Sequence, residues 1–472
     1  MENVFYFHHG WHFKRADAFP MEEAFQKHRD AKGRMVYDPA YEERDWERVT
    51  LPHTFNAGEL FSVPIQDAGS GQRRTAAFYR NTLDIPPEHR GENVFLEFEG
   101  VRQTCYAYVN GHLAGYYEAG VGPFGFDVTP FLSPSGKNCI VIATDNTSTR
   151  NIPFCIAETP NKPDVIPGSY LLSQEEPVPE NRAGVGFFWN CNDFNPTLGG
   201  ISQPVKIHFK KNVYLTLPLY ANLQTKGAYV YADSFDFEKG SCRLHVEAEA
   251  RNMRSVPVKA RLRVSVKDLQ GKEIAAFSSE ESILPSHAAA MAELPRKISI
   301  TSEDAYRWDE ETAHYVPVPE EKCAPTETAS VCVDTLTASS VVDQVSFWEP
   351  ADPALYRVTV TLIAEGEETD ETVIETGFRQ VEYDQDRGVL INARPVWLRG
   401  YAQRATNEWA ASGIAPQWLH DQDAVWIRES NANHIRFMHV AGSPAEEPSE
   451  DVAAALVGGQ NAVADHEGGG AD

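Results

Sequence analysis

Short runs in which apolar and polar residues alternate, separated by turn signals, fill the first part of the chain. Typical runs are FYRNTLDIP, NVFLEFEGV, CYAYVNG, HLAGYYEAG, FGFDVTPFL and NCIVIATDN. A period of two with frequent turns predicts an antiparallel β-sandwich. Between CYAYV and HLAGYY, Asn110-Gly111 predicts a two-residue hairpin turn. Aromatic residues in these runs are interpreted as core and cross-strand packing: Phe95, Phe98, Tyr106 and Tyr108.

A second all-β pattern begins near residue 212. Its runs YLTLPLYANL, AYVYADSFDF, CRLHVEAEAR and ARLRVSVKDL have the spacing of an immunoglobulin-like sandwich, which ALYRVTVTLIA and DETVIETGFRQVEY would complete. Residues 300–345 are polar and poor in apolar alternation. This stretch is therefore predicted to be an insertion.

A different period follows from Leu398. The sequence reads LRGYAQRATNEW, then the helical pattern APQWLHDQDAVWIRES, then ESNANHIRFMHV ending at Val440. Two strands joined by a helix predict the opening βαβ unit of a parallel α/β barrel, in which strand C-terminal ends build the active site. Trp418 and Trp426 lie at helical spacing and are predicted to be core. A complete barrel needs about 250 residues. We therefore expect this chain to contain the first strands that border an active site but not the catalytic residues.

The fold class predicted is mainly β, with the start of a (β/α)8 barrel. The expected domains are a jelly-roll-like sandwich over 1–210, an immunoglobulin-like sandwich over 211–388, a barrel opening over 389–443 and a tail over 444–472. The tail is acidic, rich in Ala and Gly, and has no Lys or Arg. Such a composition predicts disorder.

Charge and cysteine usage narrow the functional classes. A net charge of −26 argues against nucleic acid and anionic membranes as partners, because phosphate binding needs clustered cations. No apolar stretch approaches the roughly 18 residues of a membrane-spanning helix. Seven dispersed cysteines without a CxxC pair, and an N-terminus without an apolar signal region, predict a cytoplasmic protein with reduced thiols. No cofactor or metal is expected; a homo-oligomer stays possible.

Several stretches taken together carry a family resemblance. They are WERVTLPHTFN, AFYRNTLDIP, VFLEFEGV, YVNGHLAGYYEAGVGPFGFDVTPFL, NDFNPTLGGISQPV, FWEPADPALYRVTV, TGFRQVEYDQDRGVLINARPVWLRG and NANHIRFMHV. With the order sandwich, immunoglobulin-like sandwich, barrel opening, the chain resembles family 2 glycoside hydrolases, the group of β-galactosidases, β-glucuronidases and β-mannosidases. The resemblance covers about residues 1–443.

The resemblance implies a retaining mechanism with two glutamates about 5 Å apart. In the family both lie on later barrel strands, past the position where this chain ends. The family's acid/base follows an Asn, which makes Asn407-Glu408 a candidate. This pair follows the first strand, however, and no second carboxylate opposes it. Glu408 is therefore interpreted as a substrate-hydroxyl contact or a structural residue, and as the acid only in second place.

Other positions match substrate contacts of the family. His439 matches the His that ends the second strand and contacts the sugar, and Arg436 matches the Arg before it. Asp193 matches a loop carboxylate that binds sugar hydroxyls, although a turn-forming role is the alternative. Arg404 takes the place of a basic residue on the first-strand loop, but the family's following His is missing. The predicted substrate-binding set is Asp193, Arg404, Asn407, Glu408, Arg436 and His439.

The function implied is hydrolysis of terminal β-linked sugars, with the catalytic half missing from this chain through truncation. The alternative is a non-catalytic carbohydrate-binding or interaction protein built on two sandwiches. A structural adhesion-type module is a third possibility that fits the all-β content but not the barrel opening. The sugar and its linkage stay open.

Overall fold

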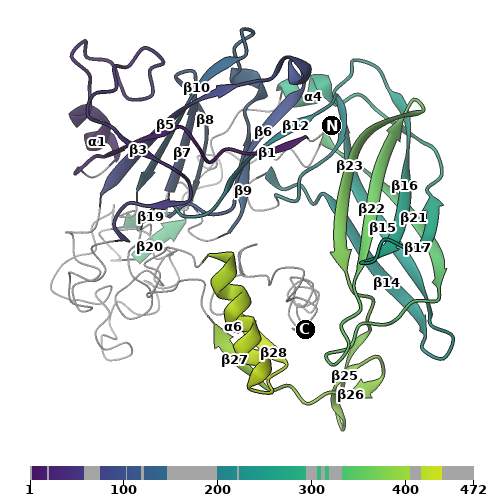
Figure 1. The fold of residues 1–472 in the computed structure, drawn as a ribbon. Coiled ribbons are helices and arrows are strands. Elements are labelled where there is room, and N and C mark those ends of the chain that lie inside the picture. Colours follow the sequence, from purple (N-terminus) through teal and green to yellow (C-terminus); the bar gives the residue numbers. More distant parts are fainter. Residues whose placement is uncertain are drawn as a thin grey trace. The chain divides into compact units, whose positions relative to one another are not determined.

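The computed structural model describes residues 3–18, 21–57, 75–102, 104–118, 122–145, 199–219, 223–293, 306–309, 314–317, 332–403 and 416–437. The chain divides into two compact units. The first comprises Met1–Phe209, Pro295–Glu327 and Arg404–Ala415, and the second comprises Lys210–Leu294, Thr328–Gln403 and Pro416–Asp472. Strands dominate both (Figure 1), which confirms the mainly-β prediction.

The first unit is built on a β-sandwich. One sheet has the order β1 (Val4–Tyr6), β12 (Val205–Lys210), β6 (Asn93–Phe98), β9 (Phe124–Asp127). The other has the order β3 (Glu47–Val49), β2 (Trp11–Arg15), β5 (Ala76–Asp84), β10 (Lys137–Asp145), β7 (Thr104–Val109), β8 (His112–Glu118). Their facing side chains form one core, to which Leu96 and Phe98 contribute from β6 and Tyr79 and Ile142 from the other sheet.

The predicted hairpin turn joins β7 to β8. Asn110 and Gly111 both have positive φ, 52° and 85°. This pair of values is what a type I′ turn requires, and Asn-Gly supplies it at little steric cost. The turn prediction is confirmed. The packing prediction is also confirmed for Phe95 and Phe98, which are 4% and 0% exposed.

The outer face of the six-stranded sheet is covered by helix α1 (Met21–Lys27) and the loop over residues 28–46. Because neighbouring residues of a strand face opposite ways, Tyr79 enters the main core while Phe78 enters a smaller cluster with Met21 and Ala24. Phe25 stacks on Phe78 with ring centroids 5.4 Å apart. The helix thereby buries its apolar face.

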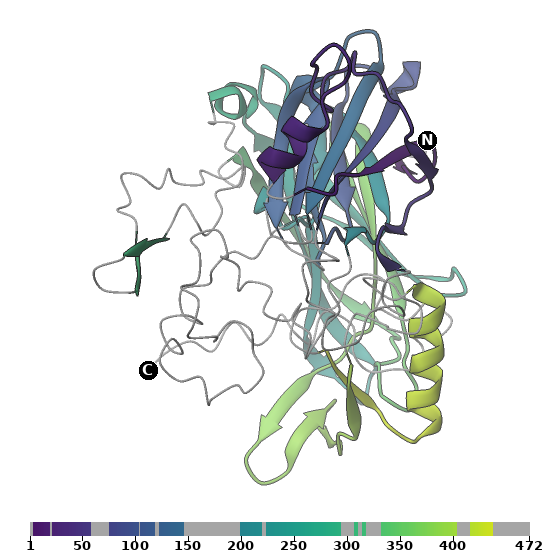
Figure 2. The same ribbon diagram turned by 90° about the vertical axis from the view of Figure 1, so that its left-hand side faces the viewer.

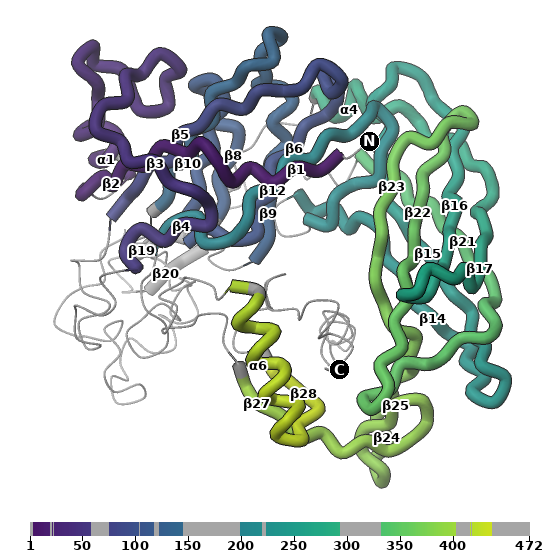
Figure 3. The backbone as a smooth tube through the Cα atoms, in the orientation of Figure 1, coloured from purple at the N-terminus to yellow at the C-terminus, as the bar shows by residue number. Residues whose placement is uncertain are grey.

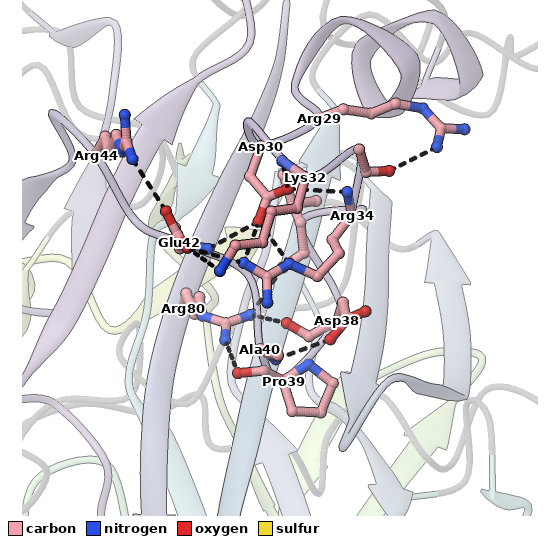
Figure 4. Close-up of polar contacts among 12 residues, drawn as sticks. Arg29, Asp30, Lys32, Arg34, Asp38, Pro39, Ala40, Glu42, Arg44 and Arg80 are labelled. Atoms are coloured by element: carbon pink, nitrogen blue, oxygen red, sulfur yellow. Dashed lines mark hydrogen bonds and ion pairs between the residues drawn. The ribbon is translucent and has the colours of Figure 1, made fainter.

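Arg80 holds this loop in place (Figure 4). Its Nη1 donates to the carbonyl oxygens of Val36 and Asp38, each at 2.9 Å, and its Nη2 donates to the carbonyl oxygen of Pro39 at 2.9 Å. Its Nε donates to Glu43 Oε1 at 2.6 Å. The guanidinium fork therefore satisfies a run of loop carbonyls that would otherwise be buried without partners.

The second unit contains another antiparallel sandwich (Figure 3). In one sheet β15 (Ser241–Asn252) pairs with β13 (Val213–Leu215), β14 (Ala228–Asp236) and β21 (Asp334–Asp343). The other contains β17 (Glu273–Ser278), β16 (Val258–Asp268), β18 (Ser282–Leu284), β22 (Tyr356–Ala364) and β23 (Glu367–Thr376). A core of Val, Leu and Ala side chains lies between the sheets.

Strand β21 corrects the predicted insertion over residues 300–345. Asp334–Asp343 pairs along its whole length with β15, and its Leu336, Ala338 and Val342 are buried. The alternation is present but weak in sequence, because a small residue and a serine occupy two of the inward positions, Ala338 and Ser340. Thr335, Thr337 and Ser339 fill three of the outward positions, and the apolar Val341 fills another. A search for alternating apolar residues therefore misses this strand.

The smaller elements complete the description. They are β4 (His53–Thr54), η4 (Pro87–His89), η5 (Thr129–Phe131), β11 (Gly200–Ile201), α4 (Ala288–Glu293), β19 (Tyr306–Asp309), β20 (His314–Pro317), β24 (Val381–Asp384), β25 (Gly388–Ile391) and β26 (Arg394–Pro395). Among the described helices, none combines the length and apolar character needed to cross a bilayer.

Candidate functional site

Two parallel strands joined by a helix form the predicted barrel opening. Strand β27 (Gly400–Gln403) pairs in parallel with β28 (His434–Phe437), and α6 (Gln417–Glu429), yellow in Figure 2, lies between them in sequence. The register pairs Gly400 with His434 and Gln403 with Phe437. Both carboxyl ends therefore lie at the same edge, which is where barrel enzymes place their active sites.

The side chain of Asn433 aligns the two strands. Its Oδ1 accepts from the backbone N–H of Arg399 at 2.9 Å, and its Nδ2 donates to the Trp397 carbonyl at 3.1 Å. The backbone N–H of Asn433 also donates to the Arg399 carbonyl, at 2.8 Å. Gly400 is required beside it, because a Cβ there would lie 2.2 Å from the His434 carbonyl oxygen. Sequence reasoning missed both residues; the signal available was an Asn directly before the second strand.

Helix α6 buries only a narrow stripe of its surface. Leu419, His420 and Ala424 are buried, whereas Trp418 and Trp426 are 56% and 57% exposed. The prediction that both tryptophans belong to the core is wrong. In the described residues only two strands form the sheet of this βαβ unit, so the covered stripe of the helix is narrow. The helix ends where Asn431 takes a left-handed conformation, φ 64°.

One predicted site residue falls within the described structure. Arg436 lies on β28 opposite Ala402, and its side chain is exposed. The other predicted residues lie outside the described residues: Asp193, Arg404, Asn407, Glu408 and His439. In sequence, Arg404 directly follows the end of β27, and His439 follows the end of β28 by two positions.

The carboxylates of the described barrel opening all lie on α6. They are Asp421, Asp423 and Glu429. Burial raises the pKa of Asp423, a shift that catalytic acids share, but a helix position is remote from the strand ends where barrel chemistry occurs. A retaining glycosidase needs two carboxyl groups about 5 Å apart. The described part of this opening does not hold that pair.

Gly199 and Gly200, which follow Asp193 in sequence, are the first residues described after position 145, and both are held by the segment Thr54–Asn56. The backbone N–H of Gly199 donates to Asn56 Oδ1 at 2.9 Å, and Gly200 pairs with Thr54. Gly200 has φ 126°, and a Cβ there would lie 2.4 Å from the His53 carbonyl oxygen. Asn56, buried and directly after the PHTF segment, is a second positioning residue that sequence reasoning missed.

Groups that could hold a metal ion are not found among the described residues. Cys105, Cys139, Cys242 and Cys332 are free thiols. Burial raises the pKa of all four thiols. They therefore lack the electropositive, exposed setting that makes a cysteine nucleophilic.

Comparison with protein families gives two matches. Residues 41–150 match the model described as the sugar binding domain of glycosyl hydrolases family 2, and residues 314–379 match a second model, described as glycosyl hydrolases family 2. The two matches lie in different segments of the chain, and the second begins within β20.

Curated relatives agree with these matches. A β-glucuronidase of Formosa agariphila is 28% identical over 417 residues, covering 88% of this chain and 35% of the relative. A β-glucuronidase of Bacteroides fragilis is 22% identical, covering 84% and 44%. A β-galactosidase of Thermoanaerobacter pseudethanolicus is 22% identical, covering 86% and 41%. The chain thus spans between 35% and 44% of the length of these relatives.

Solved structures share the fold. A β-glucuronidase of glycoside hydrolase family 2 superposes with a TM-score of 0.69 and 25% identity, covering 96% of this chain and 38% of that structure. Bacteroides uniformis β-glucuronidase 2 superposes with a TM-score of 0.63 and 18% identity, covering 96% and 41%. Nearly the whole chain therefore has a structural counterpart in longer proteins.

Proposed function

Because the chain belongs to family 2 of the glycosyl hydrolases, we propose that it is the substrate-approach part of a retaining β-glycosidase acting on terminal β-linked sugars. The observation that carries this proposal is the parallel pair β27–β28, which follows two β-sandwiches in the chain and places two strand ends at one edge. In such a barrel the acid and the nucleophile would come from later strands, and this chain would supply sugar contacts.

The proposed contacts come from three places in the chain. Arg436 and His439 would bind sugar hydroxyls or a carboxylate at the end of β28, and Arg404, Asn407 and Glu408 would do so after β27. Asp193 would contribute from the segment that precedes Gly199, whose backbone N–H donates to Asn56. Guanidinium groups suit this task because they donate charge-assisted hydrogen bonds to hydroxyl and carboxylate oxygens, and carboxylates suit it because they accept hydrogen bonds from hydroxyls. Both glucuronides and galactosides are candidate substrates, since relatives of both names match the chain.

A second candidate function is carbohydrate binding without catalysis. Each β-sandwich has its own buried core, Trp11 and Phe98 being fully buried in one and Leu262 and Val360 in the other. Units with complete cores can fold and bind without a barrel. The two functions differ in turnover but share the sugar as ligand.

Hydrolysis of aryl β-glycosides by the purified chain tests the first function. The panel comprises the galactoside, glucuronide, mannoside and glucoside, with Glu408→Gln as the variant and Glu429→Gln on α6 as the matched control. No turnover is expected, because the acid and the nucleophile would come from later strands, and turnover lost only in Glu408→Gln would contradict this by placing the acid in this chain. Sugar binding separates the two functions: binding that Arg436→Ala abolishes supports the first, and binding unchanged in Arg436→Ala favours the second. A chain that neither binds nor hydrolyses any member would contradict both.

A cytoplasmic location is a further proposal, supported by the four free thiols. Fractionation of the source cells with an antibody against the chain tests it. Recovery with cytoplasmic markers is the expected result, and recovery in an extracytoplasmic fraction would contradict it.

A further inference from the structure

Helix α4 and strand β21 both belong to the second unit, and residues 294–333 separate them in sequence. The residues that flank this interval are held at one place, the end of strand β15.

His287 fixes the departing segment. Its backbone N–H donates to the Asn252 carbonyl at 2.8 Å, and its Nδ1 accepts from the Asn252 backbone N–H at 3.0 Å. Its Nε2 lies 2.9 Å from Asp334 Oδ2 on the returning segment. Because Nδ1 must accept, the proton of a neutral imidazole lies on Nε2 and is donated to Asp334. The His287 side chain is 8% exposed.

Arg251 fixes the returning segment. Its Nε donates to the Cys332 carbonyl at 2.9 Å, and its Nη1 donates to the Tyr214 hydroxyl at 3.1 Å. Arg251 and Asn252 are consecutive residues at the end of β15. One strand end therefore holds both flanks of the interval, the returning one through Arg251 and the departing one through Asn252.

We propose that His287, Asn252 and Asp334 form a pH-sensitive clamp, closed while the imidazole is neutral and opened by its protonation. A proton on Nδ1 would face the Asn252 N–H, so that two donors would meet without an acceptor between them. Opening would release the α4 segment from the end of β15 and from the start of β21.

The charged groups that face the imidazole act in opposite directions. Burial lowers the pKa of His287, Asp334 raises it through charge and hydrogen bonding, and Arg251 lowers it, with a net lowering from the usual value. A group whose pKa is lowered in the folded state stabilises that state above its unfolded pKa, near 6.5. This stabilisation is lost as the pH falls through the folded pKa. The clamp is thus closed at neutral pH.

Hydrogen exchange of the full chain, corrected for intrinsic exchange rates, tests the clamp between pH 7.5 and pH 5. Protection of residues 285–293 and 332–336 is expected to fall by up to about tenfold per pH unit between the open-state pKa, near 6.5, and the lower folded pKa, and to level off below the folded pKa, as one titrating proton requires. Protection across β16 is expected to stay constant. Equal pH dependence in all three regions would overturn the proposal.

Variants make the test specific to His287. His287→Asn keeps an acceptor for the Asn252 N–H and cannot be protonated, so the pH step should vanish; a step that persists would overturn the proposal. His245, which lies 3.0 Å from Asp233 on a strand surface, provides the matched control His245→Asn, which should keep the step. If His287→Asn does not fold, Asp334→Asn should shift the step to lower pH, and an unshifted step would overturn it.

Discussion

At the residue scale, a buried charged side chain with several hydrogen-bond partners joins segments that are far apart in the sequence. Arg80 is 5% exposed and joins the loop over residues 28–46 to the sandwich. Sequence reasoning could not identify it, because its partners are mainly backbone carbonyls more than 40 positions away. By contrast, Asn110 and Gly111 were predictable, since the turn they form is local in sequence.

Replacement of Arg80 by Ala is expected to destabilise the first unit by about 3–5 kcal/mol, because it leaves Glu43 and several carbonyls without their buried donor. Arg44→Ala is the control. The Arg44 side chain is 72% exposed and pairs with Glu42, so its loss should change the free energy of unfolding by about 1 kcal/mol at most. Urea denaturation measures both. Equal effects would contradict the role of Arg80.

Asp30 provides a prediction for acid pH. Burial acts to raise the pKa of its carboxyl, but hydrogen bonds from the Arg34 side chain and from the backbone of Arg34, Glu42 and Lys32 lower it on balance. The folded state is therefore stabilised above the unfolded pKa, about 4, and this stabilisation is lost as the pH falls.

Melting temperatures measured from pH 7 to pH 2 test this prediction. Asp30→Asn should melt lower than the wild type at pH 7 and approach it at pH 2. Asp17→Asn, whose carboxylate is 68% exposed beside Arg15, should follow the wild-type curve. A constant difference between Asp30→Asn and wild type across the range would rule out the carboxylate as the cause.

At the element scale, strands with strong alternation were predictable and strands with small inward residues were not. Strand β16 shows the first case, with Val258, Ala260, Leu262, Val264 and Val266 all buried. Strand β21 shows the second, because Ala and Ser at inward positions hide its period. Helix α6 was predictable as a helix, but its exposed tryptophans were not, since burial depends on which elements surround it.

Leu336→Ala tests whether β21 is a core strand. Leu336 is 5% exposed, so its truncation should lower the free energy of unfolding by about 2–5 kcal/mol. Val341→Ala on the same strand is the control, because Val341 is 50% exposed and truncation there should cost about 0.5 kcal/mol. Chemical denaturation measures both variants. Similar small changes in both variants would indicate that this segment is an insertion and not a core strand.

At the scale of the whole molecule, the order of two sandwiches and a barrel opening was predictable, because both sandwiches alternate with a period of two and the barrel opening adds a helical pattern between two strands. The substrate was not, because most of the residues that would select it lie outside the described residues: Asp193, Arg404, Asn407, Glu408 and His439. Within the described residues the barrel opening presents exposed apolar side chains, among them Tyr401, Trp418 and Trp426. Clusters of exposed apolar residues mark association surfaces.

We therefore predict that the purified chain self-associates through its barrel opening. Sedimentation velocity should show species that grow with concentration, and the double variant Trp418→Glu, Trp426→Glu should remain monomeric. Tyr229→Glu, which changes an aromatic residue 44% exposed on β14, should associate as the wild type does. A monomeric wild type at all concentrations would contradict this prediction.

The central claim is that sugar binds at the carboxyl ends of β27 and β28, and saturation-transfer NMR with methyl β-glucuronide and methyl β-galactoside tests it most directly. Saturation transfer to at least one glycoside is expected for the wild type and for Arg428→Ala, whose side chain is exposed on α6. It should be lost in Arg436→Ala and in His439→Ala. Transfer to neither glycoside, or transfer unchanged in both strand-end variants, would contradict the claim.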